Sequence, residues 1–226
     1  MSYSIIIATF NNSKYIKESI NSVVTQIRSG DEVIIVNDKS TDDTRLIIES
    51  MKYNQIKLIN LDKNIGAAGA RNEGLKVANS DYIIFLDSDD IWADGIYQII
   101  DKILKLNPSI DILMGCVEHF YSPELESEIK KLYKLPPVSK ATFSSGIVTK
   151  KSLIEASGGF NQEYRERGEW IDFMSRLQML NPNIMVLDNV FYKRRIHNTN
   201  NSHKHNNLRS YIPALRENIL RKRLKN

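Results

Sequence analysis

Short apolar runs that end in polar residues alternate with helical segments through the first half of this chain. Strands are predicted at residues 4–9, 32–36, 55–61 and 82–86. The segments between them repeat apolar residues at the three- and four-residue spacing of amphipathic helices. Strand–helix–strand units of this length build a parallel sheet whose strands end at one edge, where α/β folds bind ligands. The sequence therefore predicts an α/β fold with a mostly parallel sheet flanked by helices, and Thr9, Asp38 and Asp87 are expected on one rim.

The strand predicted at 82–86 runs directly into three carboxylates, those of Asp87, Asp89 and Asp90. Carboxylates at the end of a buried strand repel one another unless they are paired, protonated or bound to a metal. One interpretation is a divalent metal held at the end of a central strand. The other is a solvated Asp/Ser turn that caps a helix beginning near Ala93.

The second half of the chain has weaker periodicity. Residues 118–140 mix aromatic, charged and proline residues and are predicted to form a long excursion. Helices are expected at 96–106, 151–156 and 168–180, and strands at 111–117, 142–149, 184–187 and 190–194. Cys116 lies inside a predicted strand and is expected to be a small buried hydrophobe. We expect a single domain with a first half at 1–117, a second half at 118–206 and a basic terminal helix at 207–226.

Positive charge is concentrated at the end of the chain. Residues 191–226 contain ten Lys or Arg residues and one acidic residue, although the whole chain has a net charge of only +4. The amphipathic pattern at 208–224 suits a membrane surface, a packed terminal helix or a homodimer contact, and no nucleic-acid partner is expected. The chain has no apolar run of about 18 residues and no signal-peptide core, so a cytoplasmic location is expected, with the inner face of the membrane as an alternative.

Four segments resemble the nucleotide-sugar-binding half of the family 2 glycosyltransferases, which have the GT-A fold. They are SIIIATFNN at 4–12, VNDKSTDDT at 36–44, NIGAAGARN at 64–72 and FLDSDD at 85–90, and their order and spacing match as well. The resemblance is strong to about residue 120 and weaker from 140 to 202. It implies an inverting enzyme that moves a sugar from a nucleotide-diphospho-sugar, with a UDP-sugar expected, to a hydroxyl of a glycan or lipid-linked acceptor. The implied cofactor is Mn²⁺ or Mg²⁺.

The resemblance also implies donor-binding roles for particular residues. Thr9 and Phe10 would line the nucleobase cleft, and Asp38 would accept a hydrogen bond from uracil or its ribose. Arg71 would lie near the base and diphosphate, and Asp87 would contact the ribose. The other implied donor-binding positions are Asn11, Gly66 and Ser88. Helix capping by Asp38 and an exposed surface position for Arg71 are the alternatives.

For the metal, the resemblance implies Asp89 as a ligand, because hard divalent cations prefer carboxylate oxygens. His197, in the loop RIHNTNNS, resembles the family histidine that closes over the diphosphate or joins the metal. An ordinary loop histidine on a polar surface is the alternative. Asp90 is expected to support the site or to cap a helix.

The base that would deprotonate the acceptor is less well marked. Many relatives carry an adjacent Glu-Asp pair at the start of the helix after a Gly-Gly-Phe turn, and here Trp170 follows Glu169 where that aspartate would be. Either Glu169 or Asp172 is therefore the predicted base. Glu169 is favoured because Asp172 shares its stretch of helix with apolar neighbours, although a first-turn glutamate can also simply complement the helix dipole.

Two other functions compete with glycosyl transfer. A sugar-phosphate nucleotidylyltransferase also uses acidic metal ligands, but those enzymes have a Gly- and Arg-rich loop after the first strand, where this chain reads TFNNSK. The second alternative is a non-catalytic module that binds nucleotide sugars or other anions.

Overall fold

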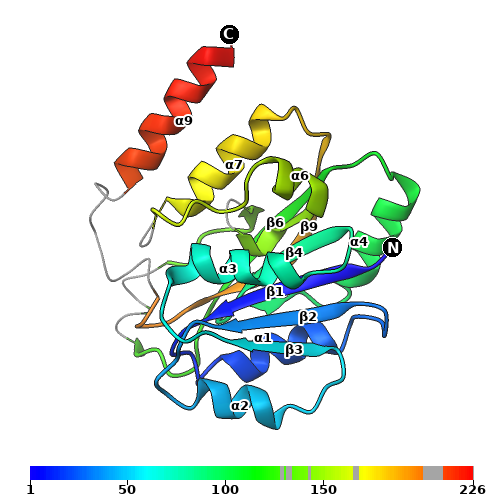
Figure 1. Ribbon diagram of the computed structural model, residues 1–226. Coiled ribbons are helices and arrows are strands. Elements are labelled where there is room, and N and C mark those ends of the chain that lie inside the picture. Colours follow the sequence, from blue (N-terminus) through cyan, green and yellow to red (C-terminus); the bar gives the residue numbers. More distant parts are fainter. Residues whose placement is uncertain (128–129, 131–133, 142–143, 165–167, 201–210, 226) are drawn as a thin grey trace.

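The computed structural model describes residues 1–225 except for 128–129, 131–133, 142–143, 165–167 and 201–210. Its centre is a twisted sheet in which the strands run in the order β3-β2-β1-β4-β8-β6-β9-β5, with β7 paired to β6 (Figure 1). Helices cover both faces of this sheet, as the sequence predicts for an α/β fold.

The first half forms the parallel part of the sheet, where β1 pairs with both β2 and β4, and β2 pairs with β3. Its elements are β1 (Tyr3–Thr9), α1 (Ile16–Val24), β2 (Glu32–Asn37), α2 (Thr44–Ser50), β3 (Ile56–Asn60), α3 (Gly66–Val77) and β4 (Tyr82–Asp87). The four predicted strands are confirmed. Strands β1, β2 and β4 are buried on both faces and therefore read as continuous apolar runs, whereas β3 is only partly buried.

The second half adds a mixed extension to the sheet. Its elements are β5 (Ile91–Trp92), α4 (Ile96–Leu106), β6 (Ile112–Tyr121), β7 (Ser139–Lys140), the short 3₁₀ turn η1 (Ser144–Gly146), β8 (Ile147–Lys150), α6 (Lys151–Ala156), α7 (Glu169–Met179), β9 (Ile184–Ile196) and α9 (Ile212–Lys225). Strand β8 runs antiparallel to β4 and β6, whereas β9 runs parallel to β6.

Several predicted boundaries are corrected. Strand β9 is continuous where two strands are predicted, and β6 extends to Tyr121, into the predicted excursion. The strand predicted at 142–149 is only Ile147–Lys150, and 142–143 lie outside the described residues. The helix predicted at 96–106 is confirmed as α4, and it begins at Ile96 and not near Ala93, because Ile91–Trp92 pairs with β9 first. Short strands and strand extensions of this kind are fixed by pairing partners that are distant in sequence.

Two apolar layers hold the helices on the sheet. On one face, alternate residues of β1 and β4 such as Ile5 and Leu86 pack with α1 and α4. On the other face, Ile6 and Phe85 pack with α3, α6 and α7. This alternation follows from the two-residue period of a strand, and it leaves the ends of the strands as the place where polar side chains gather.

A bulge between β6 and β9 creates a tight contact at Gly115. The strand register shifts on both sides of Cys116, which is buried as predicted. A Cβ added to Gly115 would lie 1.9 Å from the ring of Phe191, closer than any real contact. Only a residue without a side chain fits here.

We therefore expect Gly115→Ala to lower the free energy of unfolding by about 1–3 kcal/mol, the usual cost of overpacking a core. Urea titration followed by circular dichroism measures the change. The control is Gly30→Ala, since an added Cβ there meets no atom within 4 Å. Equal stability of the two variants would contradict the expected clash.

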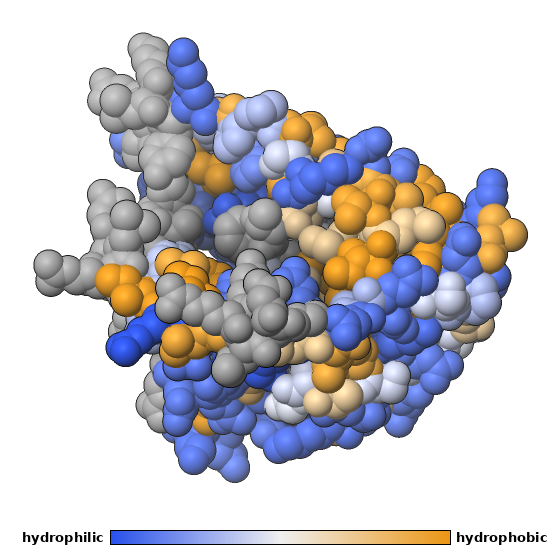
Figure 2. Space-filling model, turned by 90° about the horizontal axis from the view of Figure 1, so that it is seen from above, coloured by the Kyte–Doolittle hydropathy of each residue, from blue (hydrophilic) through white to orange (hydrophobic). Residues whose placement is uncertain are grey.

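The terminal helix α9 packs on α7 and leaves one face open. Ala214 is fully buried, whereas four apolar side chains are exposed, namely Ile212, Leu215, Ile219 and Leu220. Figure 2 views the molecule from above relative to Figure 1, and hydrophobic patches lie between hydrophilic areas on the face that it shows. Among the described residues, no helix is long and apolar enough to span a bilayer.

Candidate functional site

The predicted rim exists. In the register of the sheet Thr9 lies beside Asn37, and Ala8 lies beside Asp87. The backbone amide of Asp38 donates to the carbonyl oxygen of Thr9 at 2.8 Å. Three strands that are adjacent in the sheet thus bring their polar ends to one edge.

Asp38 is buried and binds the start of α3. Its two carboxylate oxygens accept hydrogen bonds from the backbone amides of Ile65 at 2.7 Å and Gly66 at 2.8 Å. Gly66 has a φ of +80°, a left-handed conformation that favours glycine. Asp38 therefore caps α3, not the helix that follows it in sequence, and each oxygen keeps a lone pair for a further donor.

Arg71 joins the two halves of the chain. Its guanidinium lies 2.8 Å from Oδ1 of Asp87 at the end of β4 and 3.5 Å from Oε1 of Glu169 at the start of α7. It also lies 5.5 Å from the ring centroid of Phe160. Burial lowers the pKa of Arg71, but the carboxylates of Asp87 and Glu169 outweigh burial and raise it. Arg71 is a buried cation shared by two predicted site residues, not a surface arginine.

Asp89 and His197 meet although 108 residues separate them. Nε2 of the His197 ring lies 3.0 Å from Oδ2 of Asp89, and Nδ1 lies 2.8 Å from the hydroxyl of Thr199. The ring is buried, and its centroid lies 4.5 Å from that of Tyr15, with the two ring planes tilted by 45°. The side chain of Asp89 remains 26% exposed, so the pair lies at the surface of the site. The alternative of a solvated loop histidine does not fit this burial.

Asp90 points away from this pair into the protein. It accepts hydrogen bonds from the backbone amide of Arg195 at 3.1 Å and from the hydroxyl of Ser145 at 3.3 Å. Burial raises the pKa of Asp90 well above its usual range, and the charges of Asp89 and Asp87 raise it further. This position suits the supporting role predicted for Asp90.

The loop after β1 is fixed by hydrogen bonds. The side chain of Asn11 accepts from the amide of Thr41 at 2.7 Å, and Asn12 donates to the hydroxyl of Ser88 at 2.7 Å. Thr9 is buried beneath the loop, whereas Phe10 is 48% exposed. An exposed aromatic ring at the rim is available for stacking on a planar ligand.

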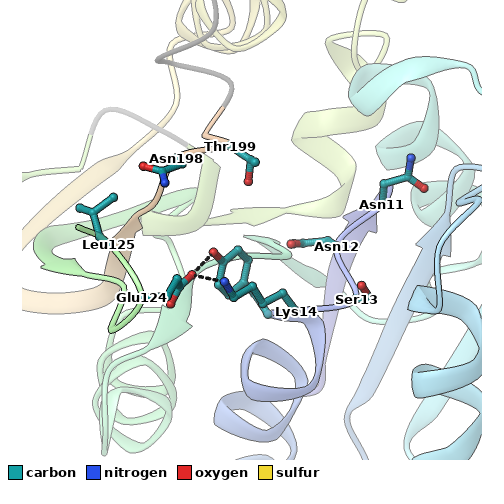
Figure 3. A pocket seen from close by; sticks show the side chains of 9 residues that line it. Asn11, Asn12, Ser13, Lys14, Glu124, Leu125, Asn198 and Thr199 are labelled. Atoms are coloured by element: carbon teal, nitrogen blue, oxygen red, sulfur yellow. Dashed lines mark hydrogen bonds and ion pairs between the residues drawn. The ribbon is translucent and has the colours of Figure 1, made fainter. Parts of the chain in front are cut away.

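A cavity of about 350 Å³ opens beside His197, between the loop after β1 and the chain that follows β6 and β9. Figure 3 shows Glu124 pointing to Lys14, with Asn12 and Ser13 on one side and Leu125 and Asn198 on the other. Burial raises the pKa of Glu124, but hydrogen bonds from Lys14, Ser122 and Tyr15 outweigh it and hold that pKa well below its usual range. Burial and the hydrogen bond to Glu124 raise the pKa of Tyr15 to about 12.

The two candidate bases have different surroundings. The side chain of Glu169 is 20% exposed and faces Arg71. Asp172 is fully buried and is paired with Arg176 and Arg221, each at 2.8 Å. Since both oxygens of Asp172 are occupied and inaccessible, the geometry favours Glu169 as a group that can meet a substrate.

Some contacts of the site carry no sequence signal. Arg195 is buried, lies over the rings of Tyr15 and Phe120, and pairs with Glu18 at 2.5 Å. Its Nε donates to the carbonyl oxygen of Asp89 at 3.1 Å. The sequence indicates Arg195 only as part of the loop that contains His197. Its contacts could not be predicted, because its partners come from distant elements.

Two curated relatives are similar to this chain in sequence. The Escherichia coli protein named UDP-Glc:alpha-D-GlcNAc-diphosphoundecaprenol beta-1,3-glucosyltransferase WfgD is 41% identical over 107 residues, which are 47% of this chain and 42% of that protein. The poly-beta-1,6-N-acetyl-D-glucosamine synthase of Staphylococcus epidermidis is 31% identical over 156 residues, 68% of this chain and 36% of that protein. The chain thus spans about 36–42% of the length of these two relatives.

A solved structure supplies the fold comparison. The structure of S. aureus TarS 1–349 in complex with UDP-GlcNAc superimposes with a TM-score of 0.78, covering 98% of this chain and 66% of that chain at 22% sequence identity. This likeness establishes the GT-A fold. The model of the family described as glycosyl transferase family 2 matches residues 4–157, more than half of the chain, and the protein therefore belongs to that family.

Proposed function

We propose that this protein is a metal-dependent inverting glycosyltransferase that moves a sugar from a UDP-sugar to a hydroxyl of a glycan or lipid-linked acceptor. The proposal is based on two contacts near the end of β4. Arg71 lies between Glu169 and Asp87, and Asp89, two residues after Asp87, meets His197 from the segment that follows β9. Family membership supports sugar transfer, and the names of the relatives support a nucleotide-sugar donor and a lipid-linked or polysaccharide acceptor. The TarS complex with UDP-GlcNAc supports a UDP-sugar.

The donor nucleotide would occupy the rim at the ends of β1, β2 and β4. Phe10 offers an exposed ring on which the nucleobase could stack. Asp38 offers a fixed carboxylate that could accept a hydrogen bond from the nucleobase or the ribose. Asp87 faces the same edge and is held by Arg71. Asn11, Gly66 and Ser88 shape this rim through the loop and helix contacts described above.

The residues at the rim fit a Mn²⁺ or Mg²⁺ ion. Asp89 supplies an oxygen and His197 a nitrogen, and Asp89 is partly exposed. Within the described part of the chain, no group of three or more acidic, histidine or cysteine side chains could hold a metal. Two protein ligands suffice for an ion that completes its coordination with water and substrate phosphates. Such an ion would stabilise the negative charge of the leaving diphosphate.

Glu169 is the proposed base. Its carboxylate takes the proton of the acceptor hydroxyl as that oxygen forms a bond to the anomeric carbon, and the bond from this carbon to the diphosphate oxygen breaks. Positive charge builds on the sugar ring in such a transition state, as it does in glycosidases. Attack from the face opposite the leaving group inverts the anomeric centre.

The proposal also assigns a role to each part of the chain. Residues 1–117 would bind the donor and 118–206 would face the acceptor, within one domain. Contact of residues 207–226 with the inner face of the membrane, and a homodimer, stay predictions. The exposed apolar side chains of α9 are compatible with either partner.

A thermal-shift panel tests the proposed function. UDP-glucose and UDP-GlcNAc, each with Mn²⁺, are compared with nucleoside triphosphates plus sugar 1-phosphates. A ligand at 100 times its Kd stabilises the native state by about 2.7 kcal/mol, which raises Tm by about 5–10 °C in a chain of this size. We expect that shift with a UDP-sugar. A shift only with the triphosphate and sugar phosphate would indicate a nucleotidylyltransferase instead.

A further inference from the structure

The buried carboxylate of Asp172 is shared by arginines from two helices. Arg176 of α7 contacts Oδ2 through Nε at 2.9 Å and Nη2 at 2.8 Å. Arg221 of α9 contacts Oδ1 through Nη1 at 2.8 Å. Arg176 alone would neutralise the charge of Asp172. The additional contact with Arg221 ties α9 to α7.

The helix that α9 holds is the one that begins with Glu169. Asp172 lies three residues after Glu169, so the two carboxylates are neighbours on one side of α7. Glu169 faces Arg71, and Asp172 faces Arg221. A shift or rotation of the first turn of α7 would change both contacts together.

A second contact links this pair to the donor side. Nη1 of Arg176 donates a hydrogen bond to the carbonyl oxygen of Ser157, just before the Gly-Gly-Phe turn. The backbone of Phe160 in that turn is held by both ends of the Asn72 amide, at 2.8 Å and 2.9 Å. Asn72 follows Arg71 on α3. Hydrogen bonds therefore connect α9 to α7, and they connect both α7 and α3 to the turn at 157–160.

The start of α7 has little local support of its own. Gly168 at its N-cap has a φ of +94°, and no side chain among the described residues caps the helix there. The first turn is positioned by the packing of Trp170 and Phe173 and by the ion pairs of Asp172. These ion pairs fix the rotation of the turn in a way that apolar packing alone does not, because hydrogen bonds are directional.

We propose that Arg221 is a positioning residue for catalysis: by holding Asp172 it fixes the first turn of α7 and keeps Glu169 in place against Arg71. The inference rests on the proposed function, in which Glu169 is the base. Displacement of a catalytic group by about 1 Å can cost on the order of 100-fold in rate, so a distant tether can control turnover.

The experiment compares Arg221→Met with Arg216→Met, since Arg216 is an exposed arginine of the same helix. Hydrogen exchange measured by mass spectrometry reports on the amides of α7 without any substrate. Release of UDP from UDP-GlcNAc with Mn²⁺ gives kcat and the donor KM, with kcat expressed per donor-binding site. Arg221→Lys is a third variant, which keeps the positive charge but loses the planar guanidinium group that hydrogen-bonds to a carboxylate.

We expect exchange in the first two turns of α7 to be about tenfold faster in Arg221→Met than in Arg216→Met, with β1 and β4 unchanged, because local opening follows local contacts. In Arg221→Met we expect kcat to fall about tenfold and KM to stay within twofold of wild type. Arg221→Lys is expected to recover part of the lost protection from exchange and part of the lost kcat. If Arg221→Met does not fold, the same measurements are made on Arg221→Lys and Arg216→Lys, and smaller changes in exchange and kcat are expected.

The inference is overturned by unchanged exchange in α7 or by exchange that rises equally throughout the chain. It is also overturned if Arg221→Met lowers kcat as much in a Glu169→Gln background as in the wild type, because residues that act through one group are not additive. Wild-type UDP release by Glu169→Gln alone would instead refute the proposed base, and the exchange data would still decide whether Arg221 holds α7.

Discussion

Glu169→Gln is expected to lower sugar transfer by about 10²–10⁴-fold while leaving the affinity for the nucleotide sugar within about twofold of wild type. Glutamine keeps the size of the side chain and its hydrogen bonding toward Arg71 but cannot take a proton from the acceptor. Initial rates of UDP release together with calorimetric binding of the donor separate the two effects.

Glu163→Gln is the matched control for Glu169, since Glu163 is exposed and lies in the loop before the same helix. Asp172→Asn tests the alternative base. If Glu169→Gln stays active and a folded Asp172→Asn variant does not, then Asp172 is the base, despite its burial between two arginines.

Asp89→Ala is expected to lower Mn²⁺-dependent transfer by at least about 100-fold, because a metal supplies several kcal/mol of transition-state stabilisation and each 1.36 kcal/mol is tenfold in rate. The fold should persist, since the side chain of Asp89 is partly exposed and its described side-chain contacts are with His197 and Asn200. A titration of activity against Mn²⁺ measures the loss, and a melting curve checks the fold.

The control for Asp89 is Asp94→Ala, an exposed aspartate a few residues along the chain. It should keep the Mn²⁺ dependence of the wild type. Full wild-type activity in excess chelator, after dialysis against it, would refute the metal assignment for Asp89 and His197 together.

The parallel half of the fold could be predicted because its signal is local. Strands such as β4 are buried on both faces, so their apolar runs are visible in sequence, and their polar ends mark the rim. By contrast, β5 has only two residues and exists because it pairs with Tyr192 and Lys193. The break that the sequence suggests near Asp188 and Asn189 is bridged by pairing of β9 with β6.

The residues of the site also differ in how far the sequence could predict their contacts. Resemblance to known motifs led to Asp89 and His197, and the structure brings these distant residues together. No pattern along the chain could reveal that Asp172 is paired with Arg221, since the two are 49 positions apart and each has an ordinary helical setting. Buried charge pairs depend on how helices dock, which periodicity does not encode.

The contact of Asp38 with the start of α3 has an electrostatic consequence. A helix N-terminus carries a partial positive charge, and in many nucleotide-binding folds that charge attracts a phosphate group. Here a carboxylate of the protein already occupies this end, with its oxygens on the amides of Ile65 and Gly66. The diphosphate of the proposed donor would thus gain little attraction from the glycine-rich turn, and positive charge to balance it would have to come from elsewhere along the rim. An enzyme built this way would bind its nucleotide weakly in the absence of an added cation.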